Sequence, residues 1–172
     1  MCFTTYMFKR TPSVSYFRNF IFGVEDSLVS TVGLLSGIAI AGVPRETIFL
    51  TGTILILVEA FSMAAGAFLS ESSAEEYEDG VDKPRSDLIS GVVMFCSYFF
   101  SGFIPLSSYL IWPVNIALTL SIFFSVIALL ILGAIGARIS GTSIVKDALR
   151  MAIIGGIAIG IGVGAGVIVS AY

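Results

Sequence analysis

The chain has 172 residues, of which 56% are hydrophobic and 12% are charged, and its mean hydropathy is +1.00. This composition excludes an ordinary soluble domain and indicates a polytopic membrane protein. The formal net charge is −3, and because the basic residues form no patch, nothing supports nucleic-acid binding. Histidine is absent, so cation and proton handling falls to carboxylates. Cys2 and Cys96 alone imply no disulfide framework.

The first half of the chain predicts two membrane spans after a polar start. Residues 1–19 carry basic and aromatic side chains and lack a small-residue cleavage site, which indicates a cytoplasmic lead-in rather than a cleaved signal peptide. Apolar segments 20–41 and 46–69 follow, each close to the ~20 residues that cross a bilayer. Pro44 breaks the connection between them.

The second half predicts three more spans. Residues 70–87 form an acidic hydrophilic loop, and the uncharged stretch after it is too long for one crossing. Pro105 and Trp112-Pro113 interrupt this stretch, which favours spans at 88–110 and 113–137, with a last span at 148–170. The last span carries a glycine ridge, for which we favour packing within the subunit over a subunit interface. The ridge consists of Gly156, Gly160 and Gly164, with Gly162 and Gly166 beside them.

The expected fold is therefore all-α, with five transmembrane helices. Eight basic residues fall on one side of this topology and only Arg45 falls on the other, so the N-terminus and the acidic loop are expected in the cytoplasm. The eight are Lys9, Arg10, Arg18, Lys83, Arg85, Arg138, Lys146 and Arg150.

Asp26 and Glu59 are the main candidates for function. A carboxylate inside a membrane helix costs at least ~2.5 kcal/mol and is a functional candidate by default. Small and polar residues at three- and four-residue steps flank both acids, which predicts that they face a helix contact. Helix rise predicts Met63 level with Asp26 and Glu59 one turn deeper. Two carboxylates with a thioether suit a divalent transition metal. Glu25, on a neighbouring face, is a weaker candidate.

Two motifs resemble the vacuolar iron transporter family. The stretch FGVEDSLVSTVGLLSG at residues 22–37 is similar to the family pattern FGxxDGLVTTxGLxxG, and SMAAGAFLS at residues 62–70 is similar to SMAxGEYLS. The resemblance implies a five-helix homodimer that exchanges Fe²⁺, and often Mn²⁺, for protons and moves the metal out of the cytoplasm. It also implies that Asp26 and Met63 line the translocation path, near the dimer interface.

The chain departs from this family in two places. The family glutamate of GEYLS is Ala67 here, whereas an acid appears at Glu59. The long cytoplasmic metal-binding domain of better-known members is reduced to residues 70–87. Glu71, Glu75 and Glu78 there either share a helical face that offers oxygen ligands or form a solvated acidic end, and the sequence leaves both open.

We therefore expect proton-coupled export of Fe²⁺ or Mn²⁺ by alternating access, in a cell membrane or a vacuolar-type membrane. The metal and protons are its substrates, the lipid bilayer surrounds it, and no resident cofactor is expected. The alternative is a membrane scaffold whose acids only specify helix pairing. Enzyme activity is not expected, because the sequence holds no nucleophile and base constellation.

Overall fold

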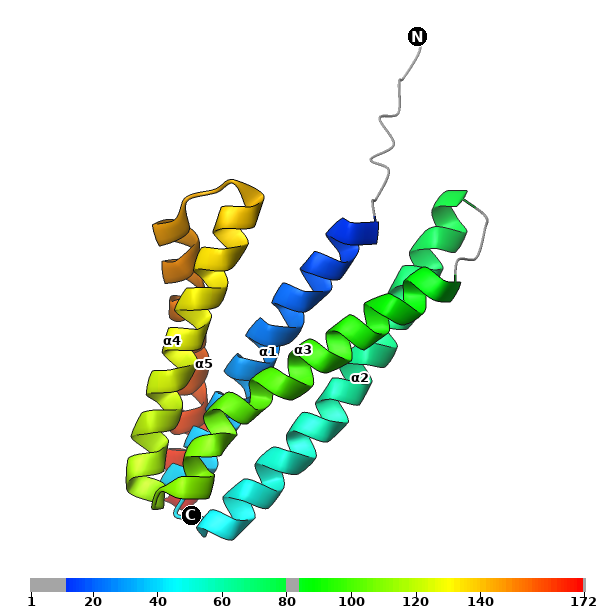
Figure 1. Cartoon of the computed structure of the whole chain (residues 1–172). Coiled ribbons are helices and arrows are strands. Elements are labelled where there is room, and N and C mark those ends of the chain that lie inside the picture. The colour runs from blue at the N-terminus through cyan, green and yellow to red at the C-terminus, as the bar shows by residue number, and fades with distance from the viewer. Residues whose placement is uncertain (1–11, 80–83, 172) are drawn as a thin grey trace.

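A computed structural model describes residues 12–79 and 84–171, which form five long helices and, within these ranges, no strand (Figure 1). All five are long and apolar enough to cross a membrane, which confirms the expected all-α class and the number of spans. The helices are α1 (Pro12–Ile40), α2 (Arg45–Asp79), α3 (Pro84–Ile111), α4 (Val114–Ser140) and α5 (Ile144–Ser170).

The helices alternate in direction, so the bundle has two distinct ends (Figure 1). At one end lie the start of α1, the α2–α3 connection and the α4–α5 turn, and we call it the N-terminal end. The far end holds the α1–α2 and α3–α4 turns and the end of α5. Helix α1 packs extensively against both α3 and α5, whereas α2 packs mainly against α3. Helix α1 is therefore central.

The helices extend beyond the expected spans at the N-terminal end. Helix α1 already begins at Pro12, within the expected lead-in, of which residues 1–11 lie outside the described part. The expected loop 70–87 is largely helical, because α2 continues to Asp79 and α3 begins at Pro84. Hydropathy marks only the apolar part of a helix, whereas Ala and Glu residues continue it into a polar environment. Proline suits the first turn, where α3 starts.

Backbone contact between glycines joins α1 to α5. A Cβ atom added to Gly37 would lie 2.6 Å from the Gly162 carbonyl oxygen, and one added to Gly33 would lie 3.3 Å from the Ala158 carbonyl oxygen. Gly162 and Gly166 in turn lie against the backbone of Gly33 and Gly37. Only residues without a Cβ allow helix axes to approach this closely.

The glycine ridge expected to pack inside the subunit faces outward instead. A Cβ added to Gly156, Gly160 or Gly164 would meet no described atom within 4 Å. The packing glycines are a different set, offset by one or two residues along α5: Gly155, Gly162 and Gly166. Two glycine sets with similar spacing occupy different faces of one helix, and spacing alone did not distinguish them.

Helices α1 to α4 share an apolar cluster toward the far end. Buried side chains from each of them meet there, and aromatic side chains of α3 pack around them. The far end is therefore filled by apolar packing. The buried members are Leu35, Ala39, Ile48, Ile56, Leu106, Tyr109 and Ala117.

Replacing a packed glycine and an outward one should have opposite effects on stability. We expect Gly162→Ala to lower the free energy of unfolding by about 1–3 kcal/mol, since its methyl group would overlap the α1 backbone. Gly160→Ala is the matched control and should be neutral or stabilising by up to about 1 kcal/mol, because alanine favours a helix. Thermal unfolding of the purified protein in detergent measures both, and equal melting temperatures would contradict the α1–α5 contact.

Candidate functional site

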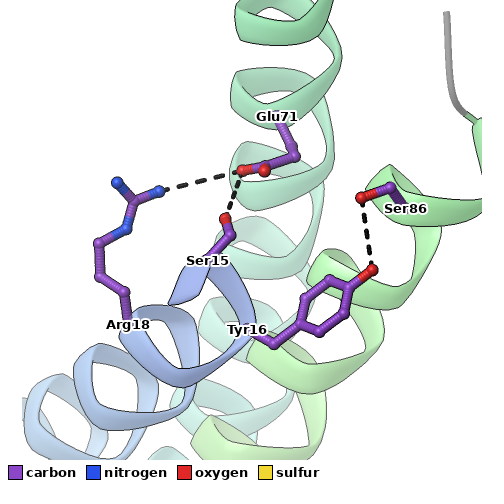
Figure 2. Close-up of polar contacts among 5 residues, drawn as sticks. All are labelled: Ser15, Tyr16, Arg18, Glu71 and Ser86. Carbon is purple, nitrogen blue, oxygen red and sulfur yellow. Dashed lines mark hydrogen bonds and ion pairs between the residues drawn. The ribbon is translucent and has the colours of Figure 1, made fainter. Parts of the chain in front are cut away.

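Polar contacts at the N-terminal end set the register of three helices. The Ser15 hydroxyl of α1 donates a hydrogen bond of 2.6 Å to the Glu71 carboxylate of α2, and Arg18 lies 4.0 Å from the same carboxylate (Figure 2). The hydroxyls of Tyr16 on α1 and Ser86 on α3 lie 3.3 Å apart (Figure 2). Glu71 is 6% exposed. One oxygen of its carboxylate therefore ties α2 to α1, and whether Glu71 also binds metal stays a prediction.

Counting from the Ser15–Glu71 contact places the other candidates by depth. Helix α1 advances toward the far end while α2 returns from it, at roughly 1.5 Å per residue. Met63 is then about 12 Å deep, level with Gly23, and Glu59 is about 18 Å deep, level with Asp26. The expected levels differ, because α2 extends further past the membrane span than hydropathy indicated. From the N-terminal end, Met63 comes before the two acids.

Asp26 and Glu59 lie within electrostatic range of each other in the middle of the bundle. Both side chains are partly buried, and their carboxylates lie close enough to interact electrostatically. The hydroxyl of the fully buried Tyr98 on α3 interacts with both of them and lies 2.8 Å from the Ser30 hydroxyl. A second contact holds α3 in place, since the Ser27 hydroxyl donates to the Tyr98 carbonyl at 2.7 Å.

This arrangement favours a bound cation. Two carboxylates side by side in an apolar environment repel each other unless a cation or protons compensate their charge. Carboxylate and hydroxyl oxygens suit divalent metals in general. Among the described residues, no three of His, Cys, Asp and Glu come together, so one chain supplies two carboxylates at most. Tyr98 is an addition from the structure, and no sequence motif marked it.

The other candidate acids lie elsewhere. Glu25 lines a separate cavity of about 590 Å³ between α1, α4 and α5, and both Asp26 and Arg150 are close enough to interact with its carboxylate. The positions of Glu75 and Glu78 fall in the last turns of α2, which confirms a helical extension, but their side chains lie outside the described part of the structure. Whether these two acids bind metal stays a prediction.

One face of α1 lines two cavities in succession. The first, of about 700 Å³, lies between α1, α2 and α3 in the N-terminal half and includes Asn19 and Met63 in its lining. The second is a groove of about 500 Å³ between α1 and α5, which begins at Asp26 and follows Gly33 and Gly37 to the far end. Asp26 lies one helical turn beyond Phe22, which lines the first cavity, and it lines the start of the second.

Comparison with known proteins supplies one match. A protein-family model described as the VIT family matches residues 17–85 and 76–167, which together span parts of all five helices. No curated protein matches the chain.

The hydrogen bond between Ser15 and Glu71 should contribute measurably to stability. We expect Ser15→Ala and Glu71→Ala to show a coupling of about 1.5–3 kcal/mol in a double-mutant cycle, since a buried charged acceptor strengthens the bond. Thermal unfolding in detergent measures the coupling. Glu46→Ala, which removes an exposed acid at the far end, serves as the control and should change little. Additive effects of the two substitutions would show that this contact does not hold α1 to α2.

Proposed function

Since this multi-pass membrane protein belongs to the VIT family, the vacuolar iron transporter family, we propose that it exchanges a divalent transition-metal ion, Fe²⁺ or Mn²⁺, for protons. The observation that carries this proposal is that Asp26 and Glu59 lie within electrostatic range of each other, about halfway through the bundle. An acid pair at this depth has few structural uses and is expensive to keep inside a membrane.

The pair provides a physical basis for exchange. With a divalent cation bound, both carboxylates are charged and compensated by the metal. Once the cation leaves, protons replace it, because two uncompensated charges at this position are unfavourable. Metal and protons therefore compete for the same oxygens and move in opposite directions. Tyr98 keeps a hydroxyl beside the pair in either state.

The direction follows from the charges. Of the six basic residues in the described helices, five lie in the segments toward the N-terminal end and only Arg45 lies at the far end, which favours a cytoplasmic location of the N-terminal end. The metal then enters through the cavity beside Met63, binds between Asp26 and Glu59, and leaves along the groove between α1 and α5. This is export from the cytoplasm, to the outside of a cell or into a vacuole.

A second copy of the chain would complete the site. One chain offers two carboxylates, and the groove that starts at Asp26 is open on the side away from the bundle. Glycine and alanine along the groove would allow close approach of another helix. A homodimer with two-fold symmetry would place a second α1 against this groove and bring a second acid pair to the same axis.

Transport should require both acids. We expect proteoliposomes with the wild-type chain to take up Fe²⁺ or Mn²⁺ when a proton gradient is imposed. Asp26→Asn and Glu59→Gln should each lower the rate by about tenfold or more, since each removes one charged ligand without changing the shape of the side chain. Glu46→Gln, exposed at the far end, should transport normally. Absence of flux of both metals in the wild type would favour the scaffold alternative, and normal flux in Glu59→Gln would remove Glu59 from the site.

The groove should lie at the subunit contact. In a chain with Cys2→Ser and Cys96→Ser, we expect Leu34→Cys, which lines the groove on α1, to form intermolecular cross-links with a short bis-maleimide. Ile131→Cys, exposed on α4, is the control and should not form them. Cross-linking only through α4, or a monomer in native mass spectrometry, would contradict this dimer.

A further inference from the structure

The cavity in the N-terminal half is lined by potential metal ligands to which the proposed transport step assigns no role. Its volume is about 700 Å³, and it lies between the Ser15–Glu71 contact and the level of Asp26. Besides Met63, its lining includes Asn19 from α1 and Met94 from α3, so three different helices contribute a potential ligand. Ser62 and Ser70 of α2 add hydroxyl groups.

Asn19 has a buried amide without a partner. Its side chain is 5% exposed, and its Nδ2 atom makes no hydrogen bond with the described residues. An unpaired amide in an apolar interior is unfavourable, so such a group requires an explanation. A half-turn about the terminal side-chain bond exchanges the nitrogen and oxygen atoms, which places a carbonyl oxygen at the same point of the cavity.

Ser97 and Met94 of α3 share the space left by Gly23, and the Ser97 hydroxyl lies nearest to it. The Met94 side chain is 3% exposed, and its sulfur would lie 3.0 Å from a Cβ atom added to Gly23. Gly23 thus lets the sulfur reach the surface of α1, at the depth where Met63 lies on α2. Two thioethers and one amide therefore line a single space.

The donor set points to a transition metal rather than to a lipid chain. Apolar packing would explain two methionines, but it leaves the buried Asn19 amide without a hydrogen-bond partner. Thioethers prefer softer metals, whereas Mg²⁺ and Ca²⁺ prefer oxygen ligands alone. Arg18 at the rim does not oppose a cation strongly, because the Glu71 carboxylate lies 4.0 Å from its guanidinium.

We propose that Asn19, Met63 and Met94 form a loading site that holds a transition-metal ion before it reaches Asp26 and Glu59. Met94 is then a residue that favours Fe²⁺ over harder cations. The inference rests on the proposed transport function. The three ligands are neutral, so the site holds the ion less tightly than the acid pair and passes it inward.

Fe²⁺ binding to a variant without the deeper acids tests the loading site directly. The variant carries Asp26→Asn and Glu59→Gln, together with Cys2→Ser and Cys96→Ser, so that methionine is its only sulfur donor. We expect anaerobic Fe²⁺ to bind in detergent and its X-ray absorption spectrum to show sulfur neighbours. Adding Met94→Leu, a volume-conserving change, should weaken binding by about tenfold and reduce the sulfur signal.

A matched methionine substitution controls for indirect effects. Met151 lies on α5 and lines the separate cavity between α1, α4 and α5 that contains Glu25. Met151→Leu should therefore leave both the Fe²⁺ affinity and the sulfur signal unchanged. Asn19→Asp should raise the affinity and make the melting temperature depend on Fe²⁺, whereas Asn19→Leu should lower the affinity. A spectrum without sulfur neighbours, or a sulfur signal that Met94→Leu leaves intact, would overturn the proposal.

Transport by the otherwise wild-type chain separates this inference from the function on which it rests. We expect Met94→Leu to transport both metals but to lose about tenfold of any preference for Fe²⁺ over Mn²⁺. Flux in the wild type together with iron bound only through oxygen would refute the loading site and leave the transporter intact. Sulfur-bound iron without flux in the wild type would refute transport and leave the metal site intact.

Discussion

The close contact between α1 and α5 is the constraint on which the rest of the arrangement depends. Gly33 and Gly37 lie against Gly162 and Gly166, and this packing draws α1 into the centre of the bundle. A central α1 leaves Asp26 only partly exposed, at the start of the groove between α1 and α5, and lets α3 approach from the other side, where Ser27 and Ser30 bond to Tyr98. The glycines thus position a carboxylate that a more peripheral helix would expose to hydrocarbon.

The acid pair makes the centre of the bundle dependent on positive charge. In a medium of low dielectric constant, repulsion between Asp26 and Glu59 is much stronger than it would be in water. The same repulsion increases the free-energy gain on binding a divalent ion or protons. A stable apolar scaffold around two carboxylates that repel each other therefore suits the exchange of a metal ion for protons. The scaffold keeps its structure while the cation bound to the carboxylates changes. The apolar cluster around Leu35 and Leu106 supplies such a scaffold toward the far end.

The sequence predicts the membrane spans and the isolated acids, but not the helix ends, the packing face of α5 or the roles of residues on α3. Burying a charge in lipid is costly, so hydropathy located the spans, and the two isolated acids that it marked lie within electrostatic range of each other. Helix ends were missed because the polar turns 70–79 are helical without being apolar. The depth of Met63 depended on those ends and was misplaced with them. Gly156 and Gly162 have equivalent local patterns, and only tertiary packing distinguishes the outward glycine from the buried one. Tyr98 and Met94 lie in a charge-free helix whose pattern gives no functional signal.

The position of Glu59 on α2 distinguishes this chain from the family motif SMAxGEYLS, which residues 62–70 otherwise resemble. Where SMAxGEYLS has glutamate, Ala67 lines the N-terminal cavity, close to Arg18 and one turn nearer the N-terminal end than Met63. Glu59 instead puts the carboxylate two turns deeper, opposite Asp26. The N-terminal cavity then has no acid of its own in its lining, and the strongest attraction for a cation lies in the middle of the membrane. In the proposed transport, an ion that enters from the N-terminal end would meet neutral donors first and charged donors second, so its binding would become more favourable as it moves inward.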